Sequence, residues 1–403
     1  MSFSVFARRL AHVLLIKHHH LKLDITRKKP FIPSPCHQTY QSTVADGGRL
    51  KRISALRTEL QKQQLEAYLV TDVKSIYYLT GFLDIAGASL SLLIPSQGES
   101  TLLTMPLSFD AALAQTHESA VKSVQAGESM VQRLLKELQT QPPRRLGYEG
   151  LSLKTFLELS TSLPETEHVA SDLVANQRMI KDSEEIVLIR RACELADIGI
   201  SAASQAIKVG VREYEVAAQA EYAMRIHGSQ GFAFETLVAS GPRSSYPHGS
   251  STDREIREGE FVTVDLGSVW GGYCSDITRT VLVGSPSPKD VRLLQLVQKV
   301  HDKMLEEIRS GVEGASLDAS ARSMFGEDYR SYFIHGLGHG VGLDIHEPPT
   351  LSQASKDILA EGNVVTDEPG LYLKDYGGVR IEDTVLVTTK GVEKLTKAPY
   401  APA

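Results

Sequence analysis

Two segments of this chain each place a pair of acidic residues in a strand, turn and strand pattern. The first, residues 261–280, holds Asp265 and Asp276 on either side of the turn signal Trp270-Gly271-Gly272. Folding the segment about Trp270 and Gly271 brings Asp265 opposite Asp276. Opposed residues of an antiparallel pair have Cβ atoms about 4.5–5.5 Å apart, where like charges are destabilising. We therefore expect a divalent cation to neutralise these two carboxylates.

The second segment, residues 363–387, repeats the arrangement. Folded about Asp375, it sets Glu368 opposite Glu382. One interpretation is a pair of surface hairpins whose acidic side chains are solvated. The other is a buried metal site, which we favour because both pairs lie in apolar strands, where unpaired charges are very costly.

Side chains alternate between the two faces of a strand, so the sequence also orients the neighbours of these acids. Arg380 shares a face with Glu382, whereas Asp367 points away from the face of Glu368. At that position the guanidinium of Arg380 either orients the carboxylates through charge-assisted hydrogen bonds or forms a structural ion pair.

A glycine-rich segment between the two hairpins adds His335, His339 and His346. Four of the seven residues 336–342 are glycine, which lets the backbone bend tightly and approach a ligand closely. Neutral imidazoles serve as metal ligands or as general acids and bases. One histidine alone is usually structural, but three of them beside two acidic hairpins indicate a site.

Four carboxylates and one imidazole form a hard, oxygen-rich ligand set. Such a set suits Mn(II), Co(II), Fe(II) or Zn(II) better than a thiolate-lined site would. Two cations about 3.5–4 Å apart lower the pKa of a shared water and polarise a carbonyl group. Peptide hydrolysis is the natural chemistry of such a centre.

Three motifs resemble those of a known family, the pita-bread metallopeptidases, and within it the aminopeptidase P and prolidase branch. They are His335-Gly-Leu-Gly-His339-Gly-Val-Gly-Leu, Glu368-Pro-Gly-Leu-Tyr and Gly377-Gly-Val-Arg-Ile-Glu382-Asp. The resemblance runs from about Arg49 to Leu395. It implies an α/β N-terminal domain like that of creatinase and prolidase, followed by an α+β pita-bread catalytic domain with pseudo-two-fold symmetry.

The resemblance also implies roles for individual residues. The implied metal ligands are Asp265, Asp276, His339, Glu368 and Glu382. Of these, Asp276 and Glu382 would bridge the two cations, and Glu368 would orient or deprotonate the attacking water. The implied substrate residues are His248 and His346, which would hold the substrate and steady the tetrahedral intermediate, and His335, a further pocket residue.

One position departs from the family pattern. The residue before Glu368 is usually apolar in the family, whereas this chain has Asp367. We expect the site to survive, because alternation points Asp367 off the metal face. A twist that brought it inward would change the metal affinity.

The implied activity is hydrolysis of Xaa-Pro bonds, either as an aminopeptidase or as a dipeptidase, on peptides with proline at the second position. The implied cofactors are two divalent ions, with Mn(II) expected first and Co(II), Zn(II) or Fe(II) as alternatives. The implied N-terminal domain shapes the cleft and supports a homodimer.

Three other functions stay open at this point. A methionine-aminopeptidase-like enzyme shares the five ligands but normally lacks an upstream domain, and Tyr78-Leu-Thr-Gly-Phe82 resembles the proline-specific branch. A creatinase-like hydrolase works without metal and would have some ligand positions replaced. A non-catalytic binding module on the same fold would have lost its ligands.

Length and patterning predict two domains, because 403 residues exceed what one core usually fills. We expect a basic leader over residues 1–46, an α/β domain over 47–164, a linker over 165–175 and the catalytic domain over 176–398. Cys36, Cys193 and Cys274 form no CxxC pair, which favours a reducing compartment. Cys274 shares a strand face with Asp276, and we interpret it as a small buried residue.

The charge is unevenly distributed. Residues 1–30 hold seven Lys and Arg against the single acid Asp24, so the remainder carries about −12 while the whole chain carries −6. This balance argues against a nucleic-acid-binding face. The leader is a transit peptide, a disordered tail or sequence upstream of the true start, and its apolar stretch is too short to span a membrane. We expect a cytoplasmic protein, or a mitochondrial one if the leader is a transit peptide.

Overall fold

The computed structural model describes residues 46–84, 87–116 and 119–400. All of them belong to one compact unit. The expected leader lies outside the described residues, apart from its last position, which begins a helix. Within the described ranges, no helix is long and apolar enough to cross a membrane.

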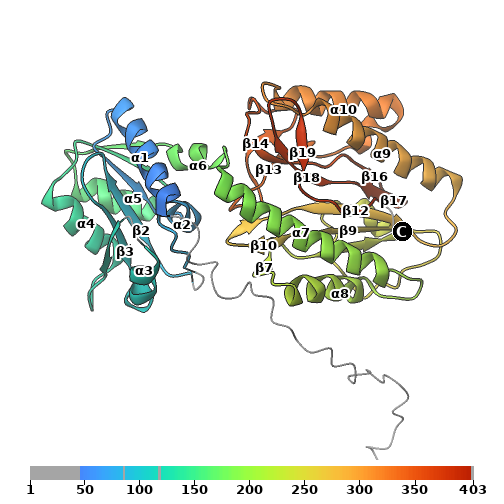
Figure 1. Cartoon of the computed structure of the whole chain (residues 1–403), viewed down its shortest axis with the longest axis horizontal. Coiled ribbons are helices and arrows are strands. Elements are labelled where there is room, and N and C mark those ends of the chain that lie inside the picture. Colours follow the sequence, from blue (N-terminus) through green and yellow to red (C-terminus); the bar gives the residue numbers. More distant parts are fainter. Residues whose placement is uncertain (1–45, 85–86, 117–118, 401–403) are drawn as a thin grey trace, which may run out of the picture. The chain divides into compact units, whose positions relative to one another are not determined.

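The N-terminal part is built on a mixed six-stranded sheet with the strand order β4-β3-β2-β1-β5-β6 (Figure 1). Its strands are β1 (Ala67–Val70), β2 (Ser91–Pro95), β3 (Ser100–Thr104), β4 (Ser119–Ser123), β5 (Arg145–Glu149) and β6 (Glu167–Ala170). Its helices are α1 (Asp46–Lys62), α2 (Val73–Thr80), α3 (Phe109–Gln115), α4 (Met130–Thr140), α5 (Leu153–Ser162) and α6 (Leu173–Arg178), with a 3₁₀ turn, η2, at Pro106–Ser108.

Residues 165–175, which we expected to be a linker, contain β6 and the start of α6. β6 pairs in parallel with β5 and forms the edge of the sheet. Its four residues are all partly or fully exposed, so they lack the apolar run that marks a buried strand in the sequence.

The C-terminal part repeats one order of elements: two helices, then an acidic hairpin. The first round holds α7 (Ser183–Ala206), α8 (Glu213–Ile226), β7 (Gly231–Phe232), β8 (Leu237–Ser240), η3 (Gly241–Ser245), β9 (Phe261–Leu266), β10 (Ser268–Trp270), β11 (Tyr273–Cys274) and β12 (Ile277–Leu282). The second holds α9 (Pro288–Glu307), α10 (Gly314–Tyr329), η4 (Arg330–Tyr332), β13 (Gly338–Gly340), β14 (Glu347–Leu351), β15 (Val364–Asp367), β16 (Gly370–Leu373), β17 (Gly377–Arg380), β18 (Asp383–Val387) and β19 (Val392–Lys394).

The helices of the two rounds enclose the strands between them. Helices α7 and α8 pack on β8 and β9, and α9 packs on β15, β16 and β17. In Figure 1 the first helix pair lies on one side of the strands and α9 and α10 lie on the other. The acidic hairpins therefore meet in the middle of this part, as expected from the pseudo-two-fold pita-bread architecture.

The first hairpin differs from its predicted register by two residues. Asp265 pairs with Thr278, not with Asp276. The turn lies at Gly271 and Gly272, both with positive φ, so that Trp270 pairs with Tyr273. A two-residue loop of this kind requires φ > 0 at both central positions, which glycine adopts without strain and tryptophan does not.

The second hairpin has the predicted register. Asp367 pairs with Asp383 in β15 and β18, and Gly370 pairs with Arg380 in β16 and β17. Both ladders have the same centre, Asp375, which has a positive φ of 61°. Glu368 and Glu382 lie between the two ladders and face each other across the same register, so this prediction is confirmed.

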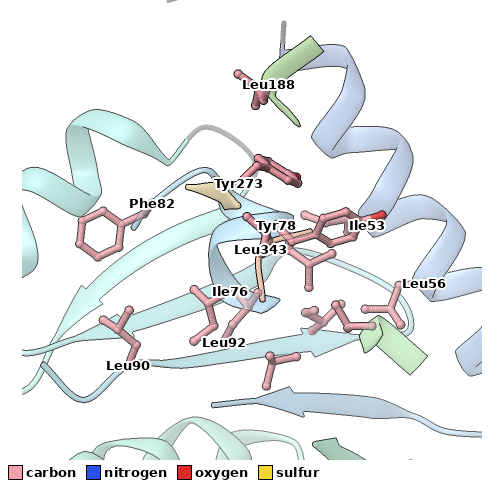
Figure 2. Packing of buried hydrophobic residues seen from close by; sticks show 14 of the residues in the cluster. Ile53, Leu56, Ile76, Tyr78, Phe82, Leu90, Leu92, Leu188, Tyr273 and Leu343 are labelled. Atoms are coloured by element: carbon pink, nitrogen blue, oxygen red, sulfur yellow. The ribbon is translucent and has the colours of Figure 1, made fainter. Parts of the chain in front are cut away.

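One hydrophobic cluster joins the two parts. It includes Ile53 of α1 and Tyr78 of α2, and also Leu188 of α7, Tyr273 of β11 and Leu343. Figure 2 shows these side chains gathered around α2. Burial of apolar surface stabilises a fold by about 25 cal/mol per Å². Since Leu343 is buried in this shared cluster, the cluster holds the segment around residue 343 against the N-terminal part.

Candidate metal centre

The five expected ligands come from five different places in the C-terminal part. Asp265 is in β9 and His339 is in β13, while Asp276, Glu368 and Glu382 lie directly before or after strands. One ligand atom from each of Asp276, His339 and Glu382 falls within a mutual distance of 4.8 Å. Strand ends and short links position all five, so the centre depends on hairpin geometry rather than on a mobile loop.

The other two residues complete the group. Nε2 of His339 lies 3.3 Å from Oε1 of Glu368 and 3.7 Å from Oδ2 of Asp276. Asp265 is buried, and its Oδ1 has no hydrogen-bond partner among the described residues. A buried carboxylate oxygen without a partner is costly, and it fits a ligand atom for a cation.

The electrostatics of the group also fit cations. Burial, followed by the charges of the neighbouring carboxylates, raises the pKa of Asp276 and of Glu382 well above the usual values. Burial likewise raises the pKa of Glu368 and lowers that of His339. A divalent cation reverses the carboxylate shifts, because it favours ionised carboxylates, and it acts in the same direction as burial on His339, because a ligating imidazole is neutral.

Two threonines bind acidic side chains of the group, and a third binds the backbone of Asp276. Thr278 donates to Oε2 of Glu382 over 2.6 Å, and Thr366 donates to Oε1 of Glu368 over 3.2 Å. Thr384 donates to the carbonyl oxygen of Asp276 and accepts from its amide. Such outer hydrogen bonds orient metal ligands.

Arg380 connects the two halves of the centre. Its Nη2 lies 2.5 Å from Oδ2 of Asp265, and its Nε donates to Thr278, which in turn binds Glu382. The buried arginine thus makes an ion pair with Asp265 and contacts the threonine that binds Glu382, a geometry compatible with both interpretations left open by the sequence. It also donates to the hydroxyl of Tyr372 over 2.6 Å.

Tyr372 was missed in the sequence. Its hydroxyl lies 2.9 Å from Nε2 of His335, so it links Arg380 to the histidine segment, and burial raises its pKa to about 12. The available signal was the motif Glu368-Pro-Gly-Leu-Tyr372, in which the tyrosine is four residues from a ligand and therefore on the same face if the strand continues.

The three histidines outside the ligand set occupy different positions. Nδ1 of His335 lies 4.0 Å from Oε2 of Glu368. The ring of His346 lies 4.3 Å from the ring of His339 in a T-shaped arrangement. His248 is exposed in the loop after η3. Burial lowers the pKa of His346, and the charges of His339 and His248 lower it further, so His248 lies within electrostatic range of His346.

The histidine segment is held by residues that the sequence did not single out. Arg322 pairs with Asp318 over 2.6 Å and donates to the carbonyl oxygens of Phe333 and His335. Asp318 also accepts from the amide of Leu337. A cleft of about 710 Å³ opens beside this segment; its walls include Arg322, Arg330, Phe333, Ile334, His335 and Gln353.

Asp367 points away from the centre, as alternation predicted. It is 0 % exposed, and its Oδ2 lies 3.7 Å from Nε2 of His301, another fully buried residue. His301 also lies 3.2 Å from Asp383. Cys274 is buried near the carbonyl oxygen of Leu343, in agreement with its interpretation as a small buried residue.

Comparisons with known proteins concern both parts of the chain. Residues 187–389 match the sequence model of Metallopeptidase family M24, and residues 52–180 match that of the Creatinase/Prolidase N-terminal domain. An Xaa-Pro dipeptidase of Pyrococcus furiosus is 38% identical over 352 residues, which cover 86% of this chain and 98% of that protein.

Solved structures resemble the whole described fold. The prolidase of Pyrococcus horikoshii has a TM-score of 0.81 and 36% identity, over 87% of this chain and 99% of that one. An X-Pro aminopeptidase of Thermotoga maritima has a TM-score of 0.79 and 32% identity, over 87% of this chain and 98% of that one.

Proposed function

The chain belongs to metallopeptidase family M24, and from that premise we propose that it hydrolyses the peptide bond between an N-terminal residue and proline. It is a metal-dependent peptidase. The observation that carries the proposal is the convergence of three buried carboxylates, the partly buried Glu368 and one imidazole, with the buried Arg380 beside them. So many carboxylates in so little space stay ionised together only when divalent cations are bound among them.

The proposed cation ligands are Asp265, Asp276, His339, Glu368 and Glu382. When bound, two divalent ions supply Lewis-acid polarisation of the scissile carbonyl and lower the pKa of a water. Asp276 and Glu382 are the proposed bridging ligands. Glu368 is the proposed acceptor of the proton of the attacking water, since Thr366 holds its Oε1 and its carboxylate lies beside His339 and His335.

The remaining residues bind and orient the substrate. His346 lies against the ligand His339, and His248 lies within its electrostatic range; we assign both to stabilising the negative charge that develops on the scissile carbonyl oxygen. His335 and Tyr372 form a hydrogen-bonded wall beside Glu368, and Arg380 fixes Asp265 and the Tyr372 hydroxyl.

Xaa-Pro dipeptides are the proposed first substrate class, because relatives with that activity in their names match over nearly their whole length. Longer peptides with proline second are the alternative, supported by the open cleft beside His335. Mn(II) is the proposed metal, with Co(II), Zn(II) and Fe(II) as alternatives.

We further propose a homodimer that acts on peptides and has no nucleic-acid or membrane partner. The proposed N-terminal domain begins at residue 47 and includes β6, the proposed catalytic domain ends at residue 398, and residues 1–46 are the proposed leader. The proposed compartment is the cytoplasm, or the mitochondrion if the leader is a transit peptide.

One panel of substrates tests the function. Chelated protein is reloaded with Mn(II), Co(II), Zn(II) or Fe(II) and assayed on Xaa-Pro, Xaa-Pro-Yaa and Met-Ala-Yaa peptides. We expect metal-dependent cleavage before proline. Preference for Met-Ala-Yaa would favour a methionine-aminopeptidase-like enzyme, and full activity after chelation a creatinase-like one. Peptide binding without turnover under every metal would favour a binding module.

A further inference from the structure

The segment that carries His346 is held by ion pairs from outside the metal centre. Glu347, the next residue, forms ion pairs with Nζ of Lys181 at 2.6 Å and with Nη2 of Arg178 at 3.0 Å. Nη2 of Arg178 also lies 2.5 Å from Oδ2 of Asp344. The carboxylates of Asp344 and Glu347, one on each side of His346, thus form ion pairs with two basic side chains. Arg178 is the last residue of α6, and Lys181 follows it.

A third basic side chain, that of Lys74, comes from α2. Nζ of Lys74 lies 2.7 Å from Oδ1 of Asp344, and these two side chains are 42 % and 39 % exposed. By contrast, the side chain of Lys181 is 1 % exposed, and those of Arg178 and Glu347 are 7 % exposed. The network therefore runs from a buried end at Lys181 to an accessible end at Lys74.

The carboxylate of Glu347 lies directly against the backbone of the segment. A Cβ atom placed on Gly342 would come within 2.3 Å of Oε1 of Glu347. The amide of Gly342 donates to the carbonyl oxygen of Asp344, and its carbonyl accepts from Cys274, which anchors the segment to β11. The carboxylate of Glu347 thus packs closely on the backbone at Gly342, so the position of Glu347 is coupled to that of the segment that carries His346.

His346 is close enough to the centre for such a shift to matter, since its ring lies 4.3 Å from that of His339. We propose that Lys74 and Arg178, together with Lys181, are positioning residues that hold His346 in place through Asp344 and Glu347. The N-terminal part, through α2 and α6, then contributes residues that position a side chain of the active site. This inference rests on the proposed role of His346.

Lys74 is the residue to change, because it is half exposed and its loss leaves the buried pairs of Glu347 intact. The matched control is Lys122, whose Nζ lies 2.7 Å from Oε2 of Glu137 with 41 % of its side chain exposed. Lys122 is in β4 of the N-terminal sheet, and among the described residues its ion-pair partner is Glu137, not a residue of the centre. Both are replaced by methionine in the metal-loaded full chain.

We expect Lys74→Met to lower kcat on an Xaa-Pro dipeptide by about five- to tenfold, because small misplacements of a catalytic group have effects of that order or larger. KM and bound metal stay close to wild type, Lys74→Arg restores kcat to within about twofold, and Lys122→Met leaves it unchanged. Equal losses in Lys74→Met and Lys122→Met would overturn the inference.

A second background separates positioning from general damage. In His346→Ala protein, we expect Lys74→Met to cause no further loss, because its effect passes through His346. If the two losses multiply instead, Lys74 acts on something other than His346, and the inference fails.

A spectroscopic measurement keeps the test independent of turnover. In Zn(II)-loaded, ¹⁵N-histidine-labelled protein, the ring resonances of His346 are identified by their loss in His346→Ala. We expect them to move in Lys74→Met and to stay in place in Lys122→Met. A wild type without Xaa-Pro activity would defeat the proposed function alone, whereas unmoved His346 resonances in Lys74→Met would defeat this inference.

Discussion

Replacement of Asp367 by valine should stabilise the protein, although it removes a buried charged residue one position from a ligand. Asp367 is 0 % exposed, and neither of its carboxylate oxygens has a hydrogen-bond partner among the described residues. An unsatisfied buried polar group costs about 1–3 kcal/mol, and valine removes that cost in a similar volume. His301 keeps Asp383 at 3.2 Å.

The pairing partner of Asp367 provides the opposite case. Asp383 binds Arg279 over 2.8 Å and Lys394 over 2.8 Å. Burial alone would raise its pKa, but the contacts with His301 and Arg279 outweigh burial and hold that pKa low. Breaking a buried ion pair by removing one partner costs about 3–5 kcal/mol, so Asp383→Val should destabilise by that amount.

The stability changes caused by the two variants should also differ in their dependence on pH. Burial, and then the charges of Asp383 and Glu368, raises the pKa of Asp367 in the folded state. Its presence therefore costs least in acid and costs more as the pH rises above its unfolded value, so the gain from Asp367→Val grows from acidic to neutral pH. The pKa of Asp383 is lowered, so the loss from Asp383→Val is already full at pH 5 and shrinks only below the ordinary pKa of aspartate, about 3.9.

The assay is the melting temperature of metal-loaded protein at pH 5 and pH 7.5. For a domain of 150–250 residues each kcal/mol corresponds to about 2–4 °C, so Asp367→Val should melt at least about 2 °C higher at pH 7.5 and Asp383→Val clearly lower. Bound metal is measured in both variants. Destabilisation by Asp367→Val as large as that by Asp383→Val would refute the reasoning.

Three further predictions concern the centre itself. Asp276→Ala or His339→Ala should abolish Xaa-Pro turnover while the circular dichroism spectrum stays native; full activity in either would contradict the ligand assignment. The same Asp276→Ala change should lower the melting temperature less in chelated than in metal-loaded protein, because loss of one carboxylate relieves repulsion when cations are absent. Thr278→Val removes the hydrogen bond to Glu382 and should weaken metal affinity by about tenfold or more, measured by competition with a chelator; an unchanged affinity would show that Thr278 does not orient Glu382.

The two hairpins show how far the sequence predicts the site. In the second hairpin, the turn about Asp375 and the alternating strands agree on one register, and the structure has that register. In the first, two adjacent glycines follow Trp270, and the sequence pattern alone did not identify which pair forms the turn. The positive φ of Gly271 and Gly272 decides the matter and shifts the pairing of Asp265 by two residues.

Residues that support the ligands were harder to predict, because their partners are remote in sequence. Thr278 is 104 residues from Glu382, and Lys74 is 270 residues from Asp344. Threonine and lysine are common, and their periodicity carries no signal for such contacts. The ligands themselves were recognisable because acidic residues in apolar strands are costly enough to require an explanation.

Metal stoichiometry tests the central claim most directly. Chelated protein is titrated with Mn(II), and bound ions per chain are counted by mass spectrometry of the equilibrated metal while Xaa-Pro hydrolysis is followed in the same samples. The account predicts two ions per chain at full activity and loss of both signals in Asp276→Ala. Full hydrolysis in wild-type protein with no bound ion would contradict it.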